Sequence, residues 1–274
     1  MIDLHLHTTA SDGRATPEML VAELVSAGIT VCAVTDHDTT ASIATVTALA
    51  QPHGIRVISG IEITAVADDE DVHTLGYGFD PSHPGLVSFL ETQRADRRRR
   101  LEEMRARLEA IGLSVDLEAE IAAHSRGGGK ALGRPLLAAA LVRAGHVATM
   151  SEAFERFLGR GRPGFIARQG ATPGEVVALV HAAGGIASLA HPIKLKRDAM
   201  IEPLAAGGLD AIEVFHPDHD FNAVLHYRQR AERLGLLMTG GSDFHGRDSG
   251  RVNAMGKVTV PADVFARLAE RLAL

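Results

Sequence analysis

Cysteine and aromatic residues are scarce in this chain of 274 residues, which has one Cys, no Trp, two Tyr and nine Phe. A single cysteine excludes an intrachain disulfide and any zinc site built from several thiolates. Because Cys32 lies in the apolar run 31–34, we expect it to be buried in a strand. The few aromatic rings offer little surface for stacking a long single-stranded nucleic acid, which favours a small substrate.

Long apolar runs and an excess of basic residues are also missing. No run approaches the roughly 18 residues that cross a bilayer, and the first residues lack the basic and apolar regions of a signal peptide. We therefore expect a cytoplasmic protein without a membrane partner. The net charge of −6 argues against a broad, nonspecific nucleic-acid surface, but it allows a small phosphorylated substrate in a local cationic pocket.

Strand and helix patterns alternate in the first and last parts of the chain. We expect strands at 2–7, 30–35, 55–63, 186–190, 211–215, 236–240 and 257–260, and helices at 17–27, 40–50, 173–183, 222–234 and from 261 onward. Such alternation indicates βα units with parallel strands. Seven or so strands fit an α/β barrel, and an apolar content of 46% supports a sizeable core.

The middle of the chain has a different pattern. Charged and Ala/Leu-rich helical segments dominate from about 84 to 158, so we expect a helical insertion at 98–165 in a barrel made of 1–97 and 166–274. The run Arg97 to Arg100 is typical of a polyanion site. However, Arg98 and Arg99 each have a Glu four residues later, which favours a solvated, ion-paired helix face.

Polar residues with metal-binding chemistry stand at the predicted strand ends. Alternation along the first strand sends Asp3, His5 and His7 to one face, so two imidazoles converge on one volume. Any one such residue could be purely structural. Their repetition at the carboxyl ends of parallel strands predicts a site for several metal ions. The remaining candidates are Asp12 in a loop, then His37, Glu62, His73, His191, Asp243 and His245.

The ordered set of motifs resembles the PHP family, named for polymerase and histidinol phosphatase. Its features are an N-terminal Asp-x-His-x-His, a strand-end His, a Glu and a late Asp-x-His. The resemblance implies a distorted, TIM-like barrel of seven strands that binds three divalent ions, of which Mn²⁺ is favoured. The mixed His and carboxylate set also suits Zn²⁺ or Fe²⁺. The implied ligands are His5, His7, Asp12, His37, Glu62, His73, His191, Asp243 and His245.

Phosphate ester hydrolysis follows from such a cluster, because bridged cations generate hydroxide at neutral pH and clamp the attacking and leaving oxygens. The resemblance implies a subgroup that acts on nucleotides or short RNA. Removal of the 3′-phosphate from nucleoside 3′,5′-bisphosphates, such as adenosine 3′,5′-bisphosphate, is our leading hypothesis. Three alternatives stay open: a 5′-to-3′ exonuclease on short RNA or DNA, a histidinol phosphatase, and an inactive barrel that serves as an interaction module.

Other residues have predicted roles around the cluster. A second phosphate needs its own cations, and the candidates are Arg134, Arg160 and Lys194. His216 ends another strand, where it could contact substrate or protonate the leaving oxygen. Asp36, like Asp3, could orient ligand imidazoles. We expect the insertion to cover the barrel mouth, and the sequence leaves the oligomeric state open, with a monomer compatible.

Overall fold

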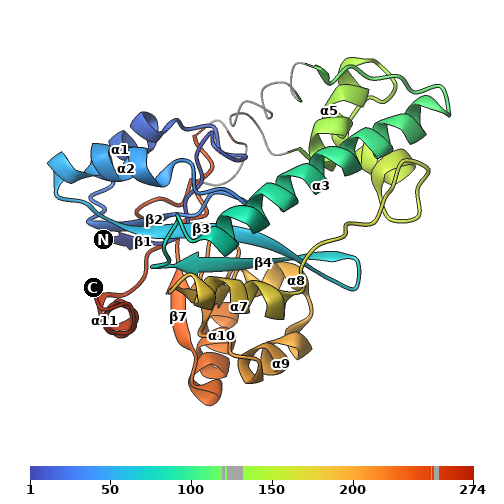
Figure 1. The fold of residues 1–274 in the computed structure, drawn as a ribbon. Coiled ribbons are helices and arrows are strands. Elements are labelled where there is room, and N and C mark those ends of the chain that lie inside the picture. The colour runs from blue at the N-terminus through green and yellow to red at the C-terminus, as the bar shows by residue number, and fades with distance from the viewer. Residues whose placement is uncertain (119–120, 122–131, 248, 250–252) are drawn as a thin grey trace.

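The barrel is built from one seven-stranded sheet in the order β1 to β7 (Figure 1). The computed structural model describes residues 1–118, 121, 132–247, 249 and 253–274. Leu4 N donates to Gly240 O at 3.1 Å and Leu6 bridges Phe244, which brings the first strand against the last. The predicted α/β barrel is therefore confirmed. The strands are Ile2–Asp3, Val31–Val34, Arg56–Ala67, Glu70–Tyr77, Ile186–Leu189, Ala211–Phe215 and Leu237–Gly240.

The strands β3 and β4 form an antiparallel hairpin, and β4 also pairs antiparallel with β5. The expectation of parallel strands throughout is wrong at this point. Asp68 and Asp69 both have positive φ, of 52° and 64°, as a two-residue hairpin turn requires, so the chain reverses without a crossover helix. The strand expected at 257–260 does not form either. Val260 N donates to Ile2 O at 3.0 Å, but these residues build no ladder.

Helices pack around the sheet as the apolar periodicity predicts. Pro173 begins α7, where Thr172 and Glu175 make a reciprocal capping box. Cys32 is fully buried, as expected. No described helix is both long enough and apolar enough to cross a membrane. The helices around the barrel are α1 Pro17–Ser26, α2 Ile43–Ala50, η1 Gln51–His53, α7 Pro173–Ala182, α8 Pro192–Leu195, η3 Asp198–Met200, α9 Ile201–Ala206, α10 Phe221–Leu234 and α11 Ala262–Arg271.

A helical arm extends from the barrel (Figure 1). Its long helix, α3 Pro84–Glu109, packs Leu86 and Leu90 into the barrel core and Leu101 and Leu108 into a second core. The boundary that we expect at 97/98 thus falls inside one continuous helix, and the division into domains stays a prediction. The arm also contains α5 Arg134–Arg143, α6 Met150–Ala153 and a π-helical turn, η2 Phe154–Leu158.

Candidate metal centre

The nine residues predicted as metal ligands meet at the carboxyl-terminal end of the barrel. They fall into four overlapping groups, and the donor atoms within each group lie within 4.8 Å of one another. Successive strands supply them, because β1, β2, β5 and β7 each end just before one or two of these residues. The groups are His7, Asp12, His37 and His245; His5, Glu62 and His191; His5, His7 and Asp243; and His37, Glu62 and His73.

Glu62 lies at the centre of the cluster and is 1% exposed. One carboxylate oxygen, Oε1, lies 2.8 Å from His73 Nδ1 and 2.9 Å from His191 Nε2. The other, Oε2, lies 3.2 Å from both His5 Nε2 and His7 Nε2. The two oxygens therefore face different sets of imidazoles, which is the arrangement of a carboxylate that can bridge two cations.

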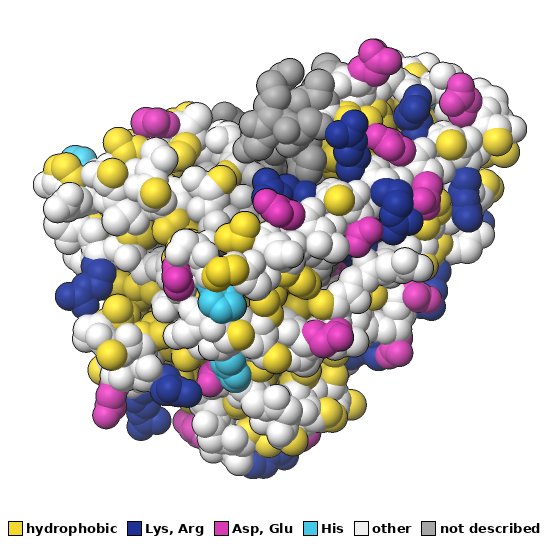
Figure 2. Space-filling model, in the orientation of Figure 1, with side chains coloured by type: hydrophobic (Ala, Val, Ile, Leu, Met, Phe, Trp, Pro, Cys, Tyr) yellow, Lys and Arg dark blue, Asp and Glu magenta, His cyan; other side chains and the backbone are white. Residues whose placement is uncertain are grey.

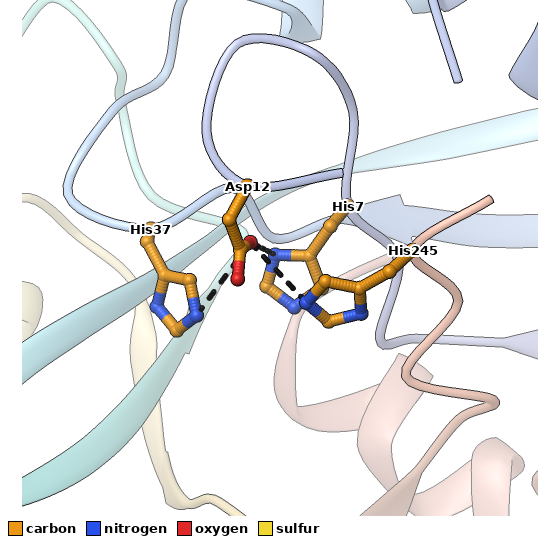
Figure 3. A group of neighbouring side chains, drawn as sticks. All are labelled: His7, Asp12, His37 and His245. Atoms are coloured by element: carbon orange, nitrogen blue, oxygen red, sulfur yellow. Dashed lines mark ion pairs between the residues drawn. The ribbon is translucent and has the colours of Figure 1, made fainter. Parts of the chain in front are cut away.

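Asp12 is the centre of a second group (Figure 3). Its Oδ1 lies 3.2 Å from His245 Nε2, 3.7 Å from His7 Nδ1 and 3.9 Å from His37 Nε2. Burial raises the pKa of Asp12, but the hydrogen bond with His245 and the charges of the neighbouring histidines outweigh burial and hold that pKa well below its ordinary value. Asp12 is therefore an ionised oxygen donor among three imidazoles.

The loop that carries Asp12 is held in place by Asp36. The Asp36 carboxylate accepts hydrogen bonds from Thr8 Oγ1 and Ser11 Oγ, each at 2.7 Å, and from Ser42 Oγ. We expected Asp36 to orient a ligand imidazole, whereas its hydrogen bonds within the described chain go to hydroxyl groups and the Thr8 amide. Its contribution to the site is to position the loop.

Backbone geometry at two ligand positions is unusual. His191 has a φ of 25° and Asp243 a φ of 48°, both in the left-handed region that side chains of this kind rarely adopt. Gly241 precedes Asp243, and a Cβ there would lie 2.3 Å from His5 N, so only glycine lets the end of β7 approach the first strand this closely. Such strain is typical of functional sites, because it aims a side chain at a fixed point.

The protonation states of the cluster suit cations. Burial lowers the pKa of His37 to about 3 and that of His191 to about 4, which keeps both rings in the neutral form that binds metal. Burial also lowers the pKa of His7, but hydrogen bonds to Asp243 and Glu62 outweigh it and raise that pKa to about 9. A proton on His7 then offsets the negative charge of the neighbouring carboxylates, as a bound cation would do.

Several ring nitrogens at the site are buried without a hydrogen bond in the described part of the chain. They include Nδ1 of His7, His37 and His191. Buried polar atoms are normally paired, so such atoms indicate a missing partner. Nitrogen and oxygen donors without thiolate fit first-row divalent ions. The nine residues thus fit the predicted cofactor, although their individual roles as ligands stay a prediction.

Glu213 is a residue that the sequence reasoning missed. It is fully buried in β6, where its Oε1 lies 2.8 Å from His5 Nδ1 and its Oε2 accepts from His191 N at 2.7 Å. Burial raises the pKa of Glu213, but the charge and hydrogen bond of His5 outweigh it and lower the pKa to about 2. This ionised carboxylate orients the His5 ring and leaves Nε2 facing the cluster. The sequence signal for Glu213 is that it is the charged residue inside the otherwise apolar strand β6.

Comparisons with known proteins agree with this site. The family model described as PHP domain matches residues 3–152, which is more than half of the chain. This chain belongs to the PHP family. A protein from Bifidobacterium adolescentis, described as a metal-dependent phosphoesterase, has a crystal structure that is 34% identical, with a TM-score of 0.83, and the match covers 98% of this chain and 96% of that one. The protein is therefore a hydrolytic PHP phosphoesterase.

Two curated relatives of this PHP protein have different names. The 3′,5′-nucleoside bisphosphate phosphatase of Chromobacterium violaceum is 33% identical over 271 residues, which are 95% of this chain and 94% of the relative. The 5′-3′ exoribonuclease Rnm of Escherichia coli strain K12 is 34% identical over 250 residues, which are 89% of this chain and 84% of the relative. The two identities differ by one percentage point, so identity alone does not separate the two activities.

Lys194 and the buried His216 lie beside Asp243 in the PHP site. Lys194 Nζ lies 3.0 Å and His216 Nε2 lies 3.2 Å from Asp243 Oδ2. The amide of Asp218 donates to His216 Nδ1 at 3.0 Å, which places the proton of a neutral ring on Nε2. Loss of that proton would leave His216 as an imidazolate anion, which is unfavourable. The geometry therefore suits His216 as a hydrogen-bond donor to substrate better than as a proton donor to the leaving oxygen.

The three predicted phosphate-binding cations do not gather at one point. Lys194 and Arg160 line one groove, together with Asp71 and Arg197. Arg160 is 64% exposed and pairs with Asp69 at 3.1 Å. Arg134 begins α5 and lies elsewhere, with its guanidinium 5.9 Å from the ring centre of Phe154 and 5.7 Å from that of Phe165.

Proposed function

We propose that this PHP protein removes the 3′-phosphate from nucleoside 3′,5′-bisphosphates, such as adenosine 3′,5′-bisphosphate, to give AMP and phosphate. The observation that carries this proposal is the match to a 3′,5′-nucleoside bisphosphate phosphatase over 95% of the chain. The complete set of nine donors supports it, because an inactive barrel that served only for interaction would have no need to keep nine metal-binding side chains together. We further propose that all nine are ligands and that Mn²⁺ is the preferred ion.

Divalent ions held by the nine residues would supply Lewis-acid charge for the phosphoryl oxygens and a nucleophile from water. The protein residues then have separate tasks. Lys194 and the Nε2–H of His216, both beside Asp243, can donate to phosphate oxygens at the rim. Glu213 keeps the His5 ring in one tautomer, and Asp36 keeps the Asp12 loop against the cluster.

A second candidate function is 5′-to-3′ exonuclease activity on short RNA. The match to the Escherichia coli exoribonuclease favours it. The groove lined by Lys194, Arg197 and Arg160 offers cations along which a short chain could continue. The two functions differ only in the group attached to the 3′-phosphate, so one site could serve both. Histidinol phosphatase, the third candidate, needs no second phosphate site.

Hydrolysis assays with Mn²⁺-loaded protein separate these candidates. We expect adenosine 3′,5′-bisphosphate to have a higher kcat/KM than histidinol phosphate or a 5′-phosphorylated oligoribonucleotide. A Glu62→Gln protein purified in the same way is the control for contaminating phosphatases. Negligible turnover of the bisphosphate beside rapid trimming of the oligonucleotide would reverse the order of the first two functions.

A further inference from the structure

Asp3 is a buried carboxylate that lies in none of the four donor groups of the metal centre. Acidic side chains are spread over the face of the molecule in Figure 2, where water can solvate them. Asp3, in contrast, ends β1 inside the barrel and has no exposed surface. Burying a carboxylate is costly unless hydrogen bonds compensate the loss of water. The partners of Asp3 therefore indicate why an acid occupies this position.

Asp3 accepts hydrogen bonds from two backbone amides. Its Oδ1 lies 2.9 Å from Ser242 N and 3.3 Å from His5 N. The sequence favours a role for Asp3 in orienting a ligand imidazole, whereas these bonds hold the backbone. The shorter bond joins residues that are 239 positions apart, and Ser242 is the residue directly before Asp243.

Backbone hydrogen bonds join the first strand to β7 and the residues after it on both sides of Ser242. One ends on Gly240 O at 3.1 Å and another on Phe244 O at 2.9 Å. The amide of Ser242, which lies between them in the chain, donates to the side chain of Asp3. The carboxylate thus takes the place of a backbone acceptor at this point of the barrel closure.

Two neighbours fit Asp3 to this position. A Cβ at Gly241 would lie 2.6 Å from Asp3 Oδ1 and 2.3 Å from His5 N, so a larger residue would push the carboxylate and the first strand away. On β4, the buried hydroxyl of Tyr77 donates to Leu4 O at 2.9 Å. The segment that carries Asp3 is therefore fixed on one side by β4, and it can hold the end of β7 on the other.

Asp243 has a backbone that needs such support. Its φ of 48° lies in the left-handed region, and a residue stays there only when its surroundings fix it. Asp243 Oδ1 lies 3.4 Å from His5 Nε2 and 3.3 Å from His7 Nε2, where these three side chains form one donor group. Anchoring Ser242 limits the rotation by which the chain could relieve this strain and turn the carboxylate away.

We propose that Asp3 is a positioning residue that holds Asp243 in its left-handed conformation and so completes the ion position between His5, His7 and Asp243. Asp3 contacts no cation in this role. The inference rests on the proposed ligand set and does not depend on which phosphate ester is hydrolysed. Loss of Asp3 should weaken the binding of one ion, whereas the ions beside Asp12 and His73 should stay bound.

Titration of the metal-free protein with Mn²⁺, followed by calorimetry, tests the proposal. We expect the affinity for one ion to fall about 10- to 100-fold in Asp3→Ala, as is typical when a partner of a metal ligand is removed, and the other ions to keep their native affinity. Asp3→Asn keeps an acceptor oxygen and should recover part of the loss. Asp210→Ala is the matched control, because Asp210 accepts from Ala187 N at 2.9 Å at the opposite end of the barrel. It should bind every ion as the native protein does.

A double variant shows whether Asp3 acts through Asp243. Asp243→Ala should lose the same ion, and the addition of Asp3→Ala should cause no further loss of affinity, because both changes remove one interaction. Circular dichroism melting of each variant excludes global unfolding as the cause. Native affinity for every ion in Asp3→Ala, equal weakening of all ions, or additive losses in the double variant would overturn the proposal. If the native protein binds neither Mn²⁺ nor Zn²⁺ nor Fe²⁺, the proposed ligand set fails first, and the role of Asp3 fails with it.

Discussion

The metal centre and the arginines at the junction of arm and barrel, Arg97 and Arg168, are neighbours that the chain builds in different ways. The nine residues of the metal centre come from barrel strands and the loops that follow them, so sheet register determines where they meet. These junction arginines join the arm to the barrel: Arg97 and Arg168 both pair with Asp38, and Arg168 also lies 3.3 Å from Asp71. The metal-binding donors thus come from the barrel, whereas the junction depends on how the arm packs against the barrel. Changes at the metal centre should therefore affect every substrate.

Glu62→Gln should give the largest effect. The variant removes the charge of the carboxylate whose two oxygens face five imidazoles. We expect kcat/KM to fall at least about 1000-fold, because several kcal/mol of metal-assisted stabilisation of the transition state are lost and each tenfold is about 1.4 kcal/mol. Adenosine 3′,5′-bisphosphate and 3′-monophosphate should lose equally. Glu70→Gln, exposed on the same hairpin, is the matched control. A loss of kcat/KM confined to the bisphosphate would contradict a role of Glu62 that is common to all substrates.

Glu213→Gln should lower kcat/KM about 10- to 100-fold on both substrates. The amide keeps the shape but loses the charge that orients His5, and removal of a partner of a metal-ligating His typically costs this much. Metal content measured by plasma mass spectrometry should fall in parallel. Glu202→Gln, in an exposed pairing with Arg233, serves as control. Native activity and metal content in Glu213→Gln would refute the positioning role.

Asp36→Asn should have a smaller effect, about 10-fold on both substrates. It weakens charge-assisted hydrogen bonds to Thr8 and Ser11, so the loop that presents Asp12 is held less firmly. The loss should shrink as the Mn²⁺ concentration of the assay is raised, because the loop supplies one ligand. Asp80→Asn, which removes a similar but exposed contact with Ser82, should behave as native. A loss that is independent of Mn²⁺ would contradict this interpretation.

Arg160→Ala should have the smallest effect, less than about twofold in kcat/KM for the bisphosphate. Its ion pair with Asp69 is solvent-exposed, and such pairs contribute roughly 0–1 kcal/mol to stability. The result separates Arg160 from Arg134, although the sequence predicts both as phosphate-binding residues. A loss of 10-fold or more in steady-state assays would place the second phosphate in the groove that Arg160 and Lys194 line.

The sequence predicts the barrel and the proximity of the nine residues, because alternation and strand ends are local patterns. His5 and His7 are on one face by a two-residue period, and His191 follows an apolar strand. The hairpin direction depends on Asp68 and Asp69, whose positive φ has no strong signal without glycine or asparagine. The strand at 257–260 was expected from composition, but Val260 makes only one backbone bond to Ile2.

Contacts between distant segments could not be predicted in this way. Glu213 and His5 are 208 residues apart, and Arg97 and Asp38 are 59 apart. Periodicity shows that Arg98 can pair with Glu102, but it does not show what faces Arg97. Partners of this kind are set by how the elements pack in three dimensions. The second phosphate site was therefore predicted by residue type alone, and its three predicted cations do not meet at one point.

Anomalous diffraction at the manganese edge from crystals of Mn²⁺-loaded protein tests the central claim most directly. The account predicts three peaks within about 2.0–2.3 Å of donor atoms. One should lie between His5, His7 and Asp243, one at Glu62 with His73, and one at Asp12 with His245. Active protein with no peak at these residues, or with its metal bound elsewhere, would contradict the account.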